Sequence, residues 1–122
     1  MRATRSVLVI DDNPDTLEVL ATLVQSLGAD EVARVRSAEA ALDTLQNRRF
    51  NLIVADYRLE GMDGVEFLEH LRAGGNVTPV ILFSGAPDQA GVLRATRQPK
   101  VDFFPKPFRV ADFMAAMDRL AA

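Results

Sequence analysis

The chain has 122 residues, of which 48% are hydrophobic and 25% are charged, and its formal net charge is -3 at pH 7. This length suits one domain, which we expect to span residues 1–122, and the acidic balance disfavours direct nucleic-acid binding, which depends on clustered Lys and Arg. The chain has no Cys and a single His, His70, so disulfides, thiolate-bound metals and multi-histidine metal sites are excluded.

The first part of the chain alternates strands and helices. Ser6–Ile10 is a continuous apolar run rich in β-branched residues, which is typical of a strand covered on both faces. Asn13 then caps a helix whose leucines recur at helical spacing until Gly28. Glu31–Val35 predicts a weaker strand, and Ser37 to Arg48 predicts a second helix with the serine as its cap.

The same alternation continues through the middle of the chain. Asn51–Ala55 predicts a short buried strand, and an amphipathic helix follows from Val65 to about Gly74. Pro79–Phe83 predicts the fourth strand. Residues 88–98 predict the poorest helix, because Gly91 lies inside it and its apolar face is small.

The last part of the chain completes five strand–helix units. Val101–Phe104 predicts the fifth strand, and Pro105 in or beside it removes a backbone donor, which favours a sheet edge. The final helix runs from about Val110 to the end of the chain. Strands and helices at this spacing imply βαβ units and a doubly wound parallel sheet. We expect any output domain to lie outside this chain.

The apolar runs are too short for a membrane or export signal. The run Val7–Ile10 is cut off by two aspartates, and no stretch approaches the roughly 20 apolar residues that a transmembrane helix needs. We therefore expect a cytoplasmic protein without a membrane partner.

Polar residues follow the predicted strands at the points where the strands end. Asp11 and Asp12 follow the first strand, Asp56 the third and Ser84 the fourth, and Lys106 follows the fifth. Ligands of open parallel sheets bind at the carboxyl ends of the strands. Each residue alone is explained by a turn, a cap or a solvated charge, but together they predict a functional site.

This residue set predicts phosphoryl chemistry with a hard metal ion. Three carboxylates in one cleft repel each other unless a cation neutralises them, and oxygen ligands favour magnesium. Asp56 would act as the nucleophile, Lys106 would stabilise the phosphoryl oxygens, and Ser84 would donate a hydrogen bond to one of them. Gly85, which has no side chain, would leave the approach to Asp56 open.

From about Val7 to Leu120 the sequence resembles the receiver domain of two-component response regulators. The resemblance implies that Asp11 and Asp12 are the acidic metal pair, that Asp56 accepts the phosphoryl group and that Ser84 is the switch hydroxyl. Lys106, Pro107 and Phe108 match the Lys-Pro-Phe motif of the family.

Further expectations follow from the same resemblance. The backbone carbonyl of Arg58 would join Asp11, Asp12 and Asp56 around magnesium. Phe103 would be the switch aromatic, and the peptide bond between Lys106 and Pro107 would be cis. The family fold is a flavodoxin-like five-stranded parallel sheet with strand order 2-1-3-4-5.

The resemblance also implies partners. A sensor histidine kinase or a histidine phosphotransfer protein would phosphorylate Asp56. The face of the fourth helix, fifth strand and fifth helix would then signal to an effector protein or to a missing output domain. Such a domain phosphorylates and dephosphorylates itself, and we expect it to turn over no external substrate.

Two alternatives remain at this point. A pseudo-receiver would be an interaction module without phosphotransfer, which the complete residue set disfavours. A small phosphatase with an aspartyl-phosphate intermediate also needs an acidic magnesium site. The haloacid-dehalogenase-like phosphatases use an Asp-x-Asp motif, however, and Asp56-Tyr57-Arg58 lacks the second aspartate.

Overall fold

Five parallel strands form a single sheet at the centre of the molecule. The computed structural model describes residues 4–85, 89–106 and 108–121. The strands pair in the order β2-β1-β3-β4-β5, so the expected flavodoxin-like order is confirmed. The strands are β1 (Ser6–Ile10), β2 (Glu31–Val35), β3 (Leu52–Asp56), β4 (Val80–Ser84) and β5 (Val101–Pro105).

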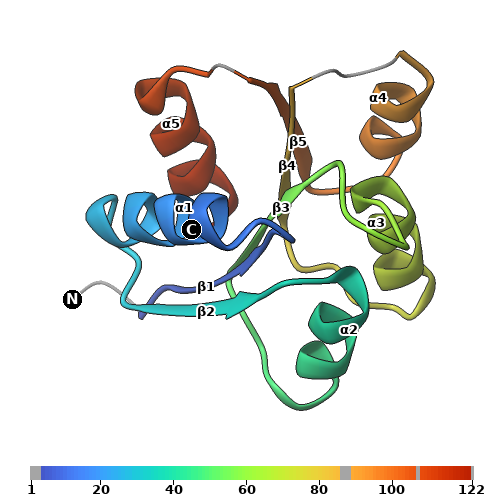
Figure 1. Cartoon of the computed structure of the whole chain (residues 1–122), viewed down its shortest axis with the longest axis horizontal. Helices are drawn as coiled ribbons and strands as arrows, with labels where there is room; N and C mark the ends of the chain where they lie inside the picture. Colours follow the sequence, from blue (N-terminus) through green and yellow to red (C-terminus); the bar gives the residue numbers. More distant parts are fainter. Residues whose placement is uncertain (1–3, 86–88, 107, 122) are drawn as a thin grey trace.

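Helices cover both faces of this sheet. They are α1 (Pro14–Ser26), α2 (Ala38–Asn47), α3 (Gly64–Ala73), α4 (Gln89–Thr96) and α5 (Val110–Leu120). Figure 1 shows α1 and α5 on one face and α2, α3 and α4 on the other. For α1 to α4 the split follows from the strand order, since right-handed crossovers that move in opposite directions along the sheet place their helices on opposite faces. None of the helices in the described ranges has the length and apolar character that crossing a bilayer requires.

The two faces of the sheet have separate cores. In β1, Val7 and Val9 pack in the core on the α1 and α5 side, and Leu8 and Ile10 pack in the core on the opposite side. All four side chains are fully buried. Consecutive strand residues point to opposite faces, so a strand with helices on both sides needs a continuous apolar run. This confirms the interpretation of the first strand.

The predicted helix signals also match the structure. The Asn13 side chain accepts hydrogen bonds from the N–H groups of Asp15 and Thr16, at 2.9 and 3.2 Å, and so caps α1. Ser37 caps α2 by accepting a bond from the Ala40 N–H at 3.0 Å. Gly28, beyond the end of α1, has φ +111°, a conformation that favours glycine.

Several boundaries differ from the prediction by one or two residues. Asp56 and Ser84 are the last residues of β3 and β4 rather than the first residues beyond them, because Asp56 still pairs with Phe83, and Ser84 with Pro105. The helix α4 ends at Thr96 and not at residue 98. The reason is Pro99, since a proline disfavours helical backbone in the residue before it.

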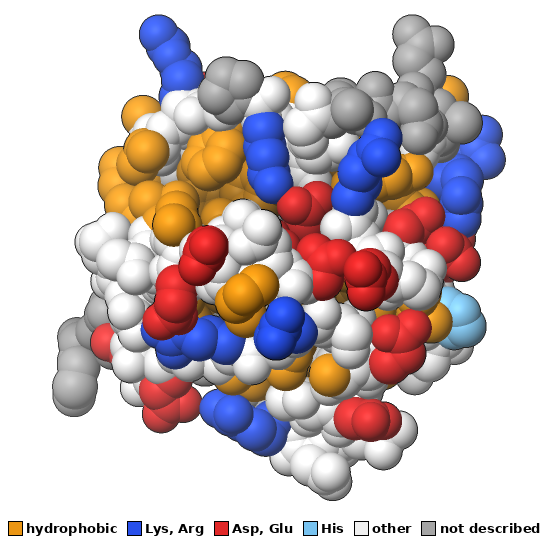
Figure 2. All heavy atoms as spheres, viewed as in Figure 1, with side chains coloured by type: hydrophobic (Ala, Val, Ile, Leu, Met, Phe, Trp, Pro, Cys, Tyr) orange, Lys and Arg blue, Asp and Glu red, His pale blue; other side chains and the backbone are white. Residues whose placement is uncertain are grey.

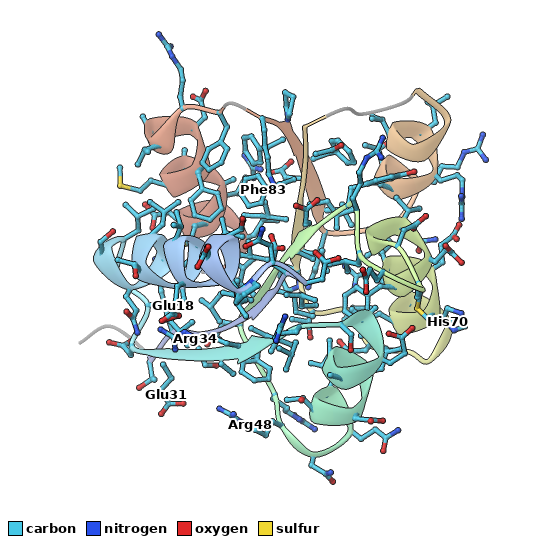
Figure 3. The ribbon with its side chains drawn as sticks, in the orientation of Figure 1. Glu18, Glu31, Arg34, Arg48, His70 and Phe83 are labelled. Atoms are coloured by element: carbon cyan, nitrogen blue, oxygen red, sulfur yellow. The ribbon has the colours of Figure 1, made fainter. Side chains whose placement is uncertain are left out.

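A cluster of aromatic rings fills the core between the sheet and α5. Phe83 of β4, labelled in Figure 3, is fully buried at its centre. Its ring centroid lies 4.6 Å from that of Phe108, 5.4 Å from Phe113 and 6.0 Å from Phe104. Offset and tilted rings at these distances attract each other in addition to burying apolar surface. This cluster therefore anchors β5 and α5 to the sheet.

We predict that Phe83→Ala destabilises the fold by about 3–5 kcal/mol, because it removes a buried ring and leaves a cavity that the neighbouring rings cannot fill. Val77→Ala is the control, since Val77 is 52% exposed and its truncation should change stability by less than about 0.5 kcal/mol. Urea unfolding of both variants measures the difference. Equal losses in the two variants would contradict this account of the core.

Candidate functional site

The carboxyl ends of four strands bring the predicted site residues to one edge of the sheet. Asp11 follows β1, Asp56 and Ser84 end β3 and β4, and Lys106 follows β5. The Lys106 Nζ lies 2.8 Å from Asp56 Oδ2, although 50 residues separate them in the chain. Figure 2 shows acidic side chains gathered near the middle of this face, with Lys and Arg side chains beside them. This confirms the prediction that the ammonium group of Lys106 and the carboxylate of Asp56 lie next to each other.

Both carboxylate oxygens of Asp56 have a partner. Oδ1 accepts a hydrogen bond from the backbone N–H of Arg58 at 2.9 Å, and Oδ2 pairs with Lys106. These contacts fix the orientation of the carboxylate. The Asp56 side chain keeps 15% of its surface exposed, so the group is held in place and still reachable from solvent.

The backbone of the neighbouring strand positions Lys106. Its N–H donates a hydrogen bond to the carbonyl oxygen of Ser84 at 2.7 Å, which extends the pairing of Ser84 with Pro105. Ser84 is fully buried. The end of β4 thus connects the predicted hydroxyl donor and the lysine through one backbone hydrogen bond.

Asp11 is a buried carboxyl group with an unusual environment. It is 1% exposed, and its Oδ1 accepts a bond from the Asn13 N–H at 2.9 Å. The pKa of Asp11 is raised from its ordinary 3.8 to about 6, and burial is the largest cause. The hydrogen bond from Asn13 lowers this pKa and the charge of Asp56 raises it. Smaller effects come from Lys106, which lowers the pKa, and from Asp12, which raises it. Among the described residues, Oδ2 of Asp11 has no hydrogen-bond partner. A buried acceptor of this kind calls for a cation or a water molecule.

The donor set fits a magnesium ion that keeps much of its water. As placed, no three acidic or histidine side chains in the described part of the chain are close enough together to hold a metal ion. Magnesium, however, binds proteins through one or two carboxylates and retains several waters. Asp11, with its unpartnered oxygen, and Asp56 supply two carboxylates. Asp12, which is half-buried, and the backbone carbonyl of Arg58 remain predicted metal ligands.

Two glycines near the site have different surroundings. A Cβ on Gly64 would lie 2.8 Å from the carbonyl oxygen of Asp56, so this residue packs directly against the backbone that carries the carboxylate. At Gly85, by contrast, a Cβ would meet no described atom within 4 Å. The expected open approach at Gly85 is consistent with this space.

Sequence reasoning missed the contact made by Tyr57. Its ring packs edge-on against Phe103 of β5, with centroids 6.1 Å apart, and touches the backbone of α4 at Gly91. The signal was present in the sequence as a glycine inside a helix. The predicted cis bond between Lys106 and Pro107 lies outside the described residues. His70, labelled in Figure 3, is exposed on α3.

The parallel strand order defines a flavodoxin-like α/β domain. The carboxylate–ammonium pair at its carboxyl edge marks an acidic site at the switch point of the sheet. The family model of the response regulator receiver domain matches residues 7–118. The chain therefore belongs to the receiver domain family of response regulators.

Individual relatives agree with this assignment. The chain is 32% identical over 111 residues to the response regulator protein TmoT of Ectopseudomonas mendocina, covering 91% of this chain and 50% of that protein. It is 35% identical over 117 residues to FleR of Pseudomonas aeruginosa, covering 94% of this chain and 24% of that protein. The chain thus spans half or less of the length of these relatives.

Solved structures show the same fold. A response regulator receiver protein from Pseudomonas putida has a TM-score of 0.88 at 25% identity, with 98% of this chain and 99% of that chain covered. The receiver domain of the sensor histidine kinase PA1611 from Pseudomonas aeruginosa, described with magnesium coordinated in its active-site cleft, has a TM-score of 0.81 at 24% identity, with 98% of each chain covered.

We predict that Asp11→Asn stabilises the metal-free protein at neutral pH by up to about 3 kcal/mol. The raised pKa means that the folded state holds the Asp11 proton more tightly than the unfolded state. The contribution of Asp11 to the free energy of unfolding is therefore greatest below pH 3.8, and this contribution is lost as the pH rises to about 6.

Urea unfolding with a chelator present, repeated across this pH range, measures the effect. The control is Asp43→Asn on the exposed face of α2, which should change stability by less than about 0.5 kcal/mol. A loss of stability in Asp11→Asn at neutral pH would contradict the assignment of a strained buried charge.

Proposed function

We propose that the chain is a phosphorelay receiver whose Asp56 accepts a phosphoryl group from a histidine kinase or a histidine phosphotransfer protein. The supporting observation is the 2.8 Å contact between Lys106 Nζ and Asp56 Oδ2, beside the unpartnered oxygen of Asp11. A nucleophilic carboxylate, a fixed ammonium and a second buried carboxylate are the groups that this reaction requires.

In the proposed reaction, a carboxylate oxygen of Asp56 attacks the phosphorus of a phosphohistidine. The new O–P bond forms as the P–N bond breaks, and the released imidazole takes up a proton. The Arg58 N–H holds the carboxylate in the orientation for attack, and Lys106 neutralises the negative charge on the phosphoryl oxygens. The hydroxyl of Ser84 donates a hydrogen bond to one of those oxygens.

The same carboxylates would hold magnesium. Asp11, Asp12, Asp56 and the carbonyl oxygen of Arg58 are the proposed ligands, and bound magnesium would supply positive charge to the transferring phosphoryl group. Without such a cation, burial raises the pKa of Asp11, and the charge of Asp56 raises it further.

The proposed output is a changed surface made by α4, β5 and α5. Phosphorylation would reposition Ser84 and Phe103, and this surface would then engage an effector or an output domain. Three of its apolar side chains are already exposed: Leu93 at 58%, Val110 at 52% and Met114 at 42%. Both helices therefore present apolar side chains to solvent that a protein partner could cover. A cytoplasmic location and the absence of external substrate turnover belong to this proposal.

We predict that incubation with a small phosphodonor and magnesium adds about 80 daltons, one phosphoryl group, to the intact protein. Asp56→Asn should show no adduct, because the amide is not a nucleophile. Asp43→Asn, which removes an exposed carboxylate on α2, should keep the adduct. Intact-mass spectrometry of the three proteins gives the answer.

The other outcomes separate the alternatives. An adduct in Asp56→Asn would overturn the assignment of the acceptor. No adduct with either a small donor or a cognate kinase would favour an interaction module, and rapid turnover of free phosphoesters would favour a phosphatase.

We also predict that magnesium raises the melting temperature of the protein, since an ion that binds only the folded state stabilises it by mass action. The rise should be strongly reduced in Asp11→Asn and retained in Asp43→Asn. Thermal unfolding over a magnesium titration measures both. An equal rise in all three proteins would mean that the ion binds elsewhere.

A further inference from the structure

The contact between Tyr57 and Gly91 links the residue after Asp56 to the backbone of α4. A Cβ built on Gly91 would lie 2.8 Å from Oη, 2.9 Å from Cε2 and 3.1 Å from Cζ of Tyr57. Real side chains do not tolerate such distances, so the ring occupies the space that any other residue at position 91 would need. The tyrosine therefore fixes how closely α4 approaches the end of β3.

Backbone conformation does not explain this glycine. The described glycines with positive φ are Gly28, Gly61 and Gly75, and Gly91 is not among them. A glycine within a helix weakens the helix relative to alanine. The close approach of the Tyr57 ring is the feature that requires a residue without a side chain at position 91.

The backbone of Tyr57 is anchored at the end of β3, beside the site. Its backbone N–H donates a hydrogen bond to the Phe83 carbonyl oxygen at 2.7 Å, and its own carbonyl accepts a bond from the Gly64 N–H at 2.8 Å. The base of the side chain is thus part of the β3 end that carries Asp56. Only the ring extends to the fourth helix.

The ring also touches the element that carries Lys106. Phe103 lies three residues before this lysine, in β5, and its ring packs edge-on against Tyr57. The direct contact of Lys106 with Asp56 belongs to the free carboxylate, because a phosphoryl group on Asp56 would attract the ammonium to its own oxygens. A shift of Lys106 would therefore move the end of β5, and with it the ring that rests on Tyr57.

We propose that Tyr57 is a positioning residue: its ring holds α4 in place while Asp56 is a free carboxylate, and it leaves Gly91 when Asp56 is phosphorylated. The proposal rests on the proposed function of Asp56. Coupling of this kind is reciprocal, so a change that drives the ring away from Gly91 must favour the phosphorylated form to the same extent.

The test is the binding of beryllofluoride, a phosphoryl mimic, in the presence of magnesium. Gly91→Ala places a methyl group where the ring lies, so it should raise the affinity for beryllofluoride about 5-fold or more. Gly74→Ala is the matched control, since a Cβ there meets its nearest neighbours at an ordinary 3.6 Å, and it should leave the affinity unchanged.

Variants of the tyrosine show whether the ring is responsible. In a Tyr57→Ala background, Gly91→Ala has nothing to displace, so it should leave beryllofluoride affinity unchanged and should raise the unfolding midpoint through better helix propensity. In a Tyr57→Phe background the ring remains, so Gly91→Ala should again raise the affinity. A purely structural role for Tyr57 would not produce this dependence on the ring.

The protein supplies its own spectroscopic readout. Tyr57 is the only tyrosine of the chain, which has no tryptophan, so intrinsic tyrosine emission reports on this ring alone. Beryllofluoride should change the emission of the wild type and have little effect on Gly91→Ala, whose ring is already displaced.

The outcomes keep the two proposals apart. If beryllofluoride binds the wild type but neither its affinity in Gly91→Ala nor the tyrosine emission changes, the role of Tyr57 is wrong and the function of Asp56 stands. If beryllofluoride and magnesium fail to bind any variant in thermal unfolding, the proposed function fails, and the role of Tyr57 fails with it.

Discussion

The pairing of Lys106 with Asp56 joins two strands that do not touch. Between β3 and β5 lies β4, and the distance of 2.8 Å between ammonium and carboxylate depends on the hydrogen bond from the Lys106 backbone to Ser84. The positive charge of Lys106 lies among acidic groups at a place with little access to water. Burial raises the pKa of Asp11 there, and the charges of Asp56 and Asp12 add to the rise. One oxygen of Asp11 has no hydrogen-bond partner among the described residues, so the electrostatics of the site agree with the proposed binding of a cation.

Much of this arrangement is predictable from the sequence because the signals are local. Apolar runs identify the strands, Asn13 and Ser37 identify two helix starts, and the polar residue at the end of a run identifies its carboxyl edge. Parallel strands then bring those edges together, so the meeting of Asp56 and Lys106 follows from topology. The strand ends were placed one residue early, because nothing in a polar residue such as Asp56 or Ser84 reveals that its backbone still pairs with a neighbour.

Contacts between distant segments could not be predicted in the same way. At Gly64 and Gly91 another part of the chain lies where a Cβ would be, yet the sequence showed Gly91 only as a weakness in a helix. A glycine in a sequence can serve an unusual backbone conformation or a close approach of another segment, and only the folded structure shows which of the two applies. The orientation of Asp11 is equally a product of three-dimensional packing: one oxygen is bonded to Asn13, and the other is buried without a partner in the described part of the chain.

The two faces of the sheet differ in how closely their helices are packed. Around Phe83, closely packed rings bind β5 and α5 to the sheet on the side of α1, whereas the opposite side meets α4 through Gly91 and the small buried side chain of Ala95. Rearrangements should therefore be absorbed by the α4 side. A partner that binds this domain both before and after a signal would have to contact the α1 side. A partner that distinguishes the two states would have to contact the α4 side.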